Sequence, residues 1–252
     1  MSLRPGLVRG LIELRQAFTG AELLGNLFWP VATLVAVVWL GDATVLPGTL
    51  GMFVTFGMLL IAQNLGADRE DGTLLRAKAI PDGVRGYLIG KIVTVSGTVL
   101  AYLLILFVPG RLIVGGLTVR WSIVAWLLPL GLVATQALGA VLGSLISSSR
   151  GAGLLSLPVL GLIAISGVFV PIAVFPGWLQ GVAQVFPVYW LGEGMRAAML
   201  PGGGRLAATA AVLGAWSIAG LALAPVLLRR MARRESGSRV AARRDRVLQR
   251  VG

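Results

Sequence analysis

The chain has 252 residues, of which 56% are hydrophobic and 13% are charged, and its mean hydropathy is +0.87. A soluble domain is usually about 25% charged, so this composition excludes that class and predicts a membrane protein built from apolar segments of about 20 residues. The formal net charge is +12, and the absence of both cysteine and histidine excludes a disulfide framework and thiolate metal sites and removes the commonest general base.

The first segment, residues 1–22, is polar but patterned, and it does not read as a signal peptide because the first apolar run begins only near Leu23. Apolar residues recur at steps of three and four, on one face of a helix, and these are Leu3, Leu7, Leu11, Leu14 and Phe18. We expect an amphipathic helix that rests in the membrane interface with its apolar face toward lipid. The alternative is an ordinary amphipathic lead-in to the first span.

Six apolar segments follow, and each is long enough to cross a bilayer. They are residues 23–40, 47–67, 87–109, 121–146, 151–170 and 206–228. The expected fold class is an all-α integral membrane protein, with a six-helix transmembrane domain over residues 23–228 and a basic tail over residues 229–252.

The basic residues predict the orientation of these spans. If both termini are cytoplasmic, only four of the 22 basic residues lie outside and 18 lie inside, and the four are Arg111, Arg120, Arg196 and Arg205. Because Lys and Arg are enriched in cytoplasmic loops, this bias predicts an N-in, C-in topology. The tail holds nine arginines, and we favour anionic lipid headgroups over nucleic acid as their partner.

Residues 171–205 contain four prolines and apolar runs too short to span. This pattern predicts short re-entrant or interfacial helices over about residues 174–200 on the outer side. Three aromatic residues there suit the headgroup level, and they are Trp178, Tyr189 and Trp190. Glu193 and Arg196 are either a gate or substrate contact or a self-neutralising pair that holds a re-entrant helix, and we favour the pair.

Several polar and small residues lie within the spans. Lys91 is close enough to the start of the third span to snorkel toward the interface. Gln63, Asn64 and Gln136 either face a pathway or form hydrogen bonds between helices. Glycines 139 and 143 have the small-xxx-small spacing that permits close helix packing.

The stretch Asp68–Lys91 is dense in charge and lies between the second and third spans. It holds five of the 22 basic and four of the ten acidic residues. We expect a short helix over about residues 68–80, with a turn at Gly72 and an N-cap at Thr73. Such a helix, with a narrow apolar side, is suited to docking on a soluble partner, and a solvated loop is the alternative.

A nucleotide-binding loop is excluded at the end of this stretch. Gly86 and Gly90-Lys91 are separated by three residues rather than four, and Ile92 follows where the phosphate loop needs Ser or Thr. No nucleophile–base pair is available without His or Cys, so we expect neither catalytic residues nor a metal site.

Two blocks of the sequence resemble type-2 ABC (ABC-2) transporter permeases, of the drug-exporter kind. Arg69-Glu70-Asp71-Gly72-Thr73-Leu74, followed by Pro81 and Gly90-Lys91, is similar to the cytoplasmic loop of that family. Residues 166–171, 175–179 and 186–187 with Arg196 are similar to its signature from the fifth span through the outer helices. The resemblance covers nearly the whole chain.

The resemblance implies a permease subunit in the bacterial inner membrane, paired with a second permease copy, two ATPase subunits and membrane lipids, with no nucleic acid. This chain would bind no cofactor, since ATP and Mg²⁺ would belong to the ATPase. A helix around Glu70–Lys78 would couple the two subunits, through Arg69, Glu70, Asp71, Gly72, Thr73, Leu74, Leu75, Arg76 and Lys78.

The resemblance also implies that the second and fifth spans line the pathway, with Thr55, Phe56, Met58, Gln63, Asn64, Ile163 and Phe169 as candidates. The outer lid would include Pro171, Pro176, Trp178, Pro187, Glu193 and Arg196. The implied cargo is a hydrophobic or amphipathic small molecule, such as a drug, antibiotic or lipid. One alternative is an exporter of a polysaccharide or lipid-linked glycan, and another is a channel or assembly protein without an ATPase. A secondary transporter is disfavoured, because that class usually needs a titratable residue inside its spans and we find none in the interiors of the predicted spans.

Overall fold

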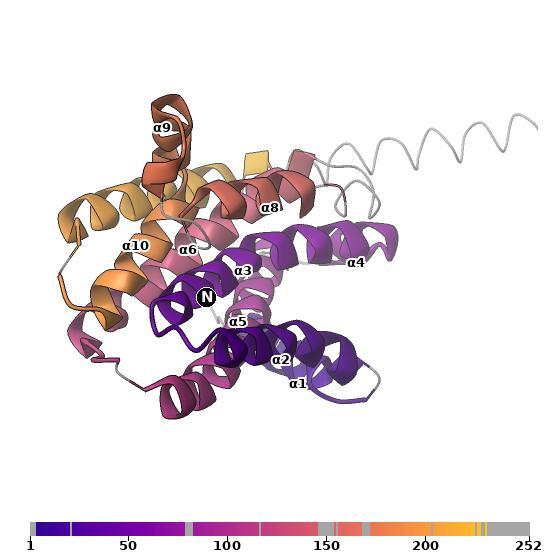
Figure 1. Ribbon diagram of the computed structural model, residues 1–252. Helices are drawn as coiled ribbons and strands as arrows, with labels where there is room; N and C mark the ends of the chain where they lie inside the picture. The colour runs from indigo at the N-terminus through magenta and orange to yellow at the C-terminus, as the bar shows by residue number, and fades with distance from the viewer. Residues whose placement is uncertain are drawn as a thin grey trace, which may run out of the picture.

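The computed structural model describes most of the chain as a bundle of helices (Figure 1). The described residues are 4–20, 22–78, 83–115, 117–145, 154, 156–167, 172–202, 204–224, 226–227 and 230. Within these ranges every regular element is helical, which agrees with the predicted fold class.

The described elements come in the following order along the chain. The first six are α1 (Arg4–Ala17), α2 (Glu22–Leu40), α3 (Val45–Glu70), α4 (Thr73–Lys78), α5 (Gly83–Val114) and α6 (Trp121–Leu145). The next four are α8 (Ser156–Ile165), the short 3₁₀ helix η1 (Ile172–Val174), α9 (Gly177–Val185) and α10 (Pro187–Met199). A last long helix covers Leu206–Ala224.

Five described helices are long and apolar enough to cross a membrane, and they coincide with the predicted first, second, third, fourth and sixth spans. The predicted fifth span, 151–170, overlaps α8, which is apolar but has only ten residues. Residues 151–153, 155 and 168–171 lie outside the described part, as does nearly all of the tail 229–252. The count of six spans and the orientation therefore stay predictions.

The centre of the bundle is α3, which packs against α5, α6, α8 and α10. In its hydrophobic window 78% of the residues are buried, compared with 11% for α2. The outward side chains of α2 are large and apolar, so its surface is suited to lipid rather than to water. Thus α3 forms the core, and α2 lies at the edge.

The contact between α3 and α6 depends on Gly139 and Gly143. A Cβ atom on Gly143 would lie 2.9 Å from the Cα of Ala62, and one on Gly139 would collide with the Met58 carbonyl. Only glycine lets the two backbones approach this closely. The small-xxx-small prediction is confirmed.

The third span extends further than predicted, because α5 passes through Pro109 and ends at Val114. A proline inside a helix removes one N–H donor, here the partner of the Ile105 carbonyl. Ending the helix there would leave several more backbone groups unpaired, which is costlier in an apolar surrounding. The helix therefore continues for five residues past the predicted end of the span at Pro109.

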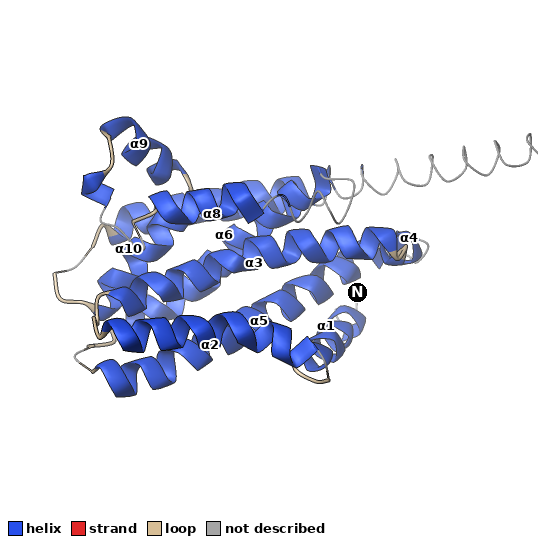
Figure 2. Cartoon of the chain, turned by 45° about the vertical axis from the view of Figure 1, so that its right-hand side comes forward, coloured by secondary structure: helices blue, strands red, loops and turns tan. Residues whose placement is uncertain are grey.

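The bundle has two distinct ends. In Figure 2, α1 and α4 lie at the right-hand end, and α9 and α10 lie at the left-hand end. The described elements next to the predicted cytoplasmic stretch Asp68–Lys91 are thus separated, along the length of the bundle, from those of the predicted outer segment.

Candidate functional site

The charged end of the bundle is built around a bend between α3 and α4. The helix α3 continues to Glu70, and the chain then turns at Gly72, whose φ is +69°. That left-handed conformation is easy only for glycine. The predicted N-cap at Thr73 is not seen, since Thr73 is already the first residue of α4 and the Arg76 N–H donates to the Gly72 carbonyl.

The structure brings the predicted coupling residues together in one continuous unit. Arg69 and Glu70 end α3, Asp71 and Gly72 form the turn, and α4 holds the others, which are Thr73, Leu74, Leu75, Arg76 and Lys78. Within this unit the Arg76 guanidinium donates to the Asp71 carbonyl at 3.0 Å. The helix α4 packs on α3 and α5 through its buried Ala77. Side-chain positions of Arg69, Leu74, Leu75 and Lys78, and all of residues 79–82, lie outside the description.

An ion-pair cluster around the buried Lys91 lies beside this bend, and its two carboxylates are partly buried. The Lys91 ammonium on α5 contacts Asp68 Oδ2 at 2.8 Å and Glu13 Oε2 at 3.0 Å. Lys91 is only 6% exposed, so the prediction that it snorkels to the interface was wrong. A lysine with two carboxylates in reach can stay charged without reaching water. The three charged residues connect α1, the end of α3 and the start of α5.

Neighbouring groups complete this cluster. The Tyr87 hydroxyl donates to Asp68 Oδ2 at 2.7 Å, and the Thr94 hydroxyl donates to Glu13 Oε2 at 3.3 Å. Arg9 donates from Nε to Glu13 Oε1 at 2.9 Å, and its guanidinium stacks over the Tyr87 ring at 5.4 Å. Two cations therefore balance two carboxylates, and each carboxylate accepts more than one hydrogen bond.

Glu13 stays ionised in this setting. Burial alone raises its pKa, but the hydrogen bond from Arg9 and the charge of Lys91 outweigh burial and hold the pKa below the ordinary value of 4.5. The carboxylate that α1 presents to the cluster is thus negative at neutral pH, which keeps its attraction to Lys91.

Glycines let α1 lie directly on α5. A Cβ on Gly6 would lie 2.6 Å from the Gly86 carbonyl oxygen, and one on Gly10 would lie 2.7 Å from that of Gly90. Both pairs are spaced four residues apart, so they lie on facing sides of two helices. Gly86 and Gly90, which do not fit a phosphate loop, therefore serve in helix packing. Sequence reasoning missed this contact, although the matching spacing in residues 1–22 could have indicated it.

The apolar stripe of α1 divides between protein and surroundings. Leu7 and Leu11 are exposed, as expected for a face directed at lipid. Leu14 instead contacts Gly97, and Phe18 packs edge-to-face on Tyr102. Because its glycines let α1 pack closely on α5, α5 covers one side of the apolar stripe. The other side of the stripe stays exposed.

The other end of the bundle is organised around α10, whose residues are mostly buried against α3 and α6. The predicted Glu193–Arg196 pair forms at 3.4 Å, and Arg196 also donates to the Gly167 carbonyl at 3.0 Å. Arg120 donates to the carbonyls of Ala197 and Leu200 at the end of α10. Backbone carbonyls at this helix end thus receive charged donors.

Aromatic residues of the segment that was predicted to lie outside differ in exposure. Arg205 donates to the Tyr189 hydroxyl at 2.5 Å and lies 4.9 Å from the centre of the Trp190 ring. Tyr189 and Trp190 are buried against protein, which contradicts the prediction that they face the headgroups, whereas Trp178 on α9 is 71% exposed. The other lid candidates, Pro176 and Pro187, precede α9 and begin α10. Pro171 lies outside the described residues.

The predicted pathway residues are dispersed. Thr55, Met58 and Ile163 are buried inside this chain, Phe56 and Asn64 are half-buried, and Gln63 is exposed. Phe169 falls outside the described part. The helices that hold the described candidates, α3 and α8, do touch each other.

The apolar helices define a multi-pass membrane protein. The sequence matches the model of the ABC-2 family transporter proteins over residues 42–226. The chain therefore belongs to that family, which confirms the resemblance, and it is a component of membrane transport rather than a catalytic subunit. No curated protein matches the sequence.

Proposed function

We propose that this chain is the membrane-spanning permease subunit of an ATP-driven exporter. Membership in the ABC-2 family implies association with an ABC ATPase, and α4 is the element best placed to receive it. The observation that supports this role most strongly is that α4 is joined by one glycine bend to α3, the most buried of the five described helices that are long enough to span a membrane. Force applied to α4 would reach the core directly.

The ion pairs around Lys91 extend this mechanical connection from α3 to two further helices. Asp68 lies two residues before the end of α3, and Lys91 connects it to both α5 and α1. Separating these helices would leave charges buried without partners, which is costly. A displacement of α4 would therefore move the three helices together instead of bending α3 alone.

The assembly that we propose contains two copies of this chain and two ATPase subunits, which hold ATP and Mg²⁺. It would lie in a bacterial inner membrane with both termini and α4 on the cytoplasmic side. The distribution of arginine and lysine supports this orientation, because only four of 22 basic residues are assigned to the outer loops.

The proposed cargo is a hydrophobic or amphipathic small molecule that is moved out of the cell along α3 and α8. The scarcity of charged residues in the apolar helices supports this class. A polysaccharide or lipid-linked glycan is the second candidate, but such a cargo is usually bound by stacked aromatic rings, and α3 presents only Phe53 and Phe56.

Reconstitution tests the proposal. The chain is purified with a candidate ABC ATPase from the same genome, and cysteine in place of Thr73 is tested for crosslinking to that ATPase. We expect crosslinking at Thr73→Cys, ATP-dependent release of amphipathic dye from vesicles, and no labelling of this cysteine from outside intact cells. A complex that hydrolyses ATP without any contact at Thr73→Cys, or external labelling of that site, would contradict it.

A further inference from the structure

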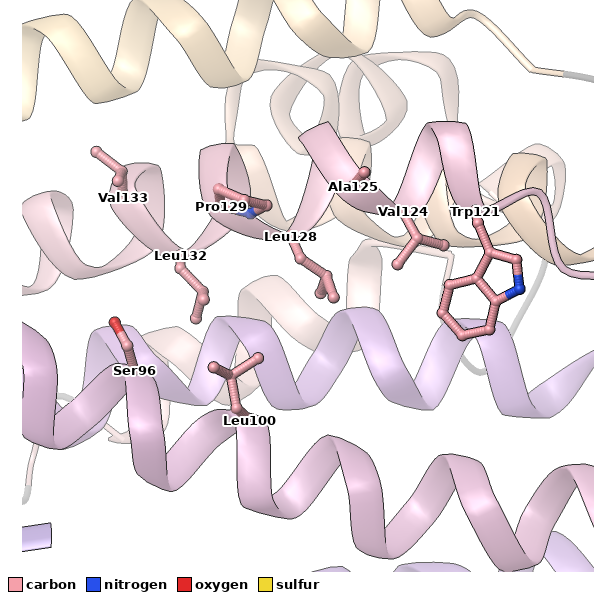
Figure 3. A pocket seen from close by; sticks show the side chains of 9 residues that line it. All are labelled: Ser96, Leu100, Trp121, Val124, Ala125, Leu128, Pro129, Leu132 and Val133. Carbon is pink, nitrogen blue, oxygen red and sulfur yellow. The ribbon is translucent and has the colours of Figure 1, made fainter.

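A groove runs between α5 and α6, apart from the predicted pathway (Figure 3). Its volume is about 580 Å³, within the range of roughly 300–1,000 Å³ typical of small-molecule sites. In Figure 3, Leu100 of α5 faces Leu128 and Leu132 of α6, and Ser96 is the hydroxyl among them. Leu100 and Trp121 are exposed, so the groove opens toward the surrounding lipid.

A smaller cavity of about 80 Å³ continues the groove inward, since both are lined by Ser96 and Val133. Gln136 lines this cavity and is 1% exposed. Its Nε2 donates to the Ser96 hydroxyl at 2.8 Å, but its Oε1 has no hydrogen-bond partner. Ser96 can satisfy only one end of the amide, whichever way the amide is turned. An unpaired buried amide atom is expensive in an apolar surrounding, so a missing partner is indicated.

We propose that the groove and cavity bind an uncharged, elongated apolar molecule whose inner end bears a hydroxyl group. The groove walls are apolar, and none of the described residues that line either space is charged, which excludes ionic headgroups. A hydroxyl both donates and accepts, so it can satisfy the free amide atom of Gln136. The shape and the single polar contact therefore match a long-chain alcohol or a similarly built amphipath.

A water molecule is a poorer fit to this position. A buried water usually makes about three hydrogen bonds, and among the described residues that line the cavity only Gln136 and Ser96 have polar side chains, beside apolar ones such as Ile61 and Leu221. The hydroxyl of an amphipath needs fewer partners, because its chain fills the groove outside. Entry would be lateral, from the bilayer between α5 and α6.

The binding test uses the purified chain in lipid nanodiscs, without ATP or ATPase. Photoreactive hexadecanol and photoreactive hexadecane are compared at equal membrane fraction, and crosslinked peptides are mapped by mass spectrometry. We expect saturable labelling of α5 and α6 by the alcohol, about three- to tenfold stronger than by the alkane, as one added hydrogen bond predicts. Equal labelling by both probes, or labelling outside the groove, would overturn the proposal.

Two variants sharpen the test. Gln136→Leu should abolish the preference for the alcohol while the protein stays folded, because it removes an unsatisfied buried amide. Gln16→Leu, the same change on exposed α1, should keep the preference. Ala125→Trp, at an exposed position of the groove wall, should block labelling by filling the space. An alcohol preference that survives Gln136→Leu would show that the site is not built as proposed.

A last arm distinguishes the source of the ligand. A transported molecule and a resident membrane alcohol share this chemistry, so labelling is repeated with the ATPase bound, before and after addition of ATP. A fall in labelling identifies transported cargo, and unchanged labelling identifies a resident lipid. Only this arm depends on the proposed export function, because binding in nanodiscs is measured without an ATPase.

Discussion

The two ends of the bundle use charge in different ways. At the charged end, Lys91 joins side chains from separate helices, Glu13 on α1 and Asp68 on α3. At the end that holds α10, Arg120 donates to the backbone carbonyl of Leu200, and Arg196 donates to that of Gly167 beside its pair with Glu193. At the charged end, ion pairs between side chains thus connect different helices. At the other end, charged donors bind neutral backbone carbonyls and hold the single helix α10 in place.

This difference has a physical consequence. A buried ion pair is strongly unfavourable once one partner is removed, because the other charge stays buried. A carbonyl that loses a charged donor loses one hydrogen bond but gains no net charge. The charged end should therefore respond to substitution as a unit, whereas the end that holds α10 should respond locally. The predictions below test this contrast.

The largest effect is expected for Lys91→Met. It leaves Glu13 and Asp68 close together and without their common cation, at a cost of about 3 kcal/mol or more in the free energy of unfolding. Thermal unfolding in detergent measures the loss. The triple change with Glu13→Gln and Asp68→Asn should recover most of the stability, because the one charge of the cluster then left is Arg9, whose side chain is 36% exposed and can be solvated by water. A Lys91→Met variant as stable as the parent would refute the cluster.

A smaller effect is expected at the end that holds α10, for Arg120→Ala. The carbonyls of Ala197 and Leu200 lose a charged donor, which costs about 1.5–3 kcal/mol. Hydrogen exchange should speed up in α10 and stay unchanged in α1. Arg111→Ala is the matched control, since Arg111 is exposed near the same end of the bundle. Equal changes in α1 and α10 would remove the distinction between the two ends.

Local patterns predicted much of this molecule. The long apolar runs indicated five spans that the structure has as helices, and the spacing of Gly139 and Gly143 indicated a close contact. Turn chemistry predicted the break at Gly72. Each of these features is determined by residues that are close together in the chain, because hydrophobic periodicity and backbone preference are local properties of a sequence.

Contacts between distant residues were not predictable in this way. Glu13, Asp68 and Lys91 belong to separate elements, and nothing in one segment indicates which charge of another it meets. The burial of Tyr189 and Trp190 escaped for a related reason, because a short helix rich in aromatic residues suits an interface and a protein core equally. The free amide atom of Gln136 likewise depends on how α5 and α6 pack.

Gly72→Val tests whether the bend matters for coupling. A branched side chain at φ +69° costs about 1–2 kcal/mol, so we expect an inserted, slightly less stable protein whose cargo no longer stimulates ATP hydrolysis. Gly41→Val is the matched control, because Gly41 has φ +64° and open space around it but precedes the other end of α3. Loss of cargo stimulation in both variants would mean that strain anywhere along α3 suffices.

The smallest effect is expected for Arg9→Gln, within the charged end itself. The Arg9 side chain is 36% exposed and that of Glu13 is 23% exposed, so their pair should contribute less than about 1 kcal/mol. Since Arg9 helps to lower the pKa of Glu13, its contribution is present above the ordinary pKa of 4.5 and is lost as pH falls through the lowered value. In Arg9→Gln the pKa of Glu13 rises toward 4.5, so acid destabilisation should begin at a higher pH. Unfolding midpoints of the parent and of Arg9→Gln, measured between neutral and acidic pH, check this prediction. Identical pH profiles of the two proteins would mean that Lys91 alone stabilises the Glu13 carboxylate.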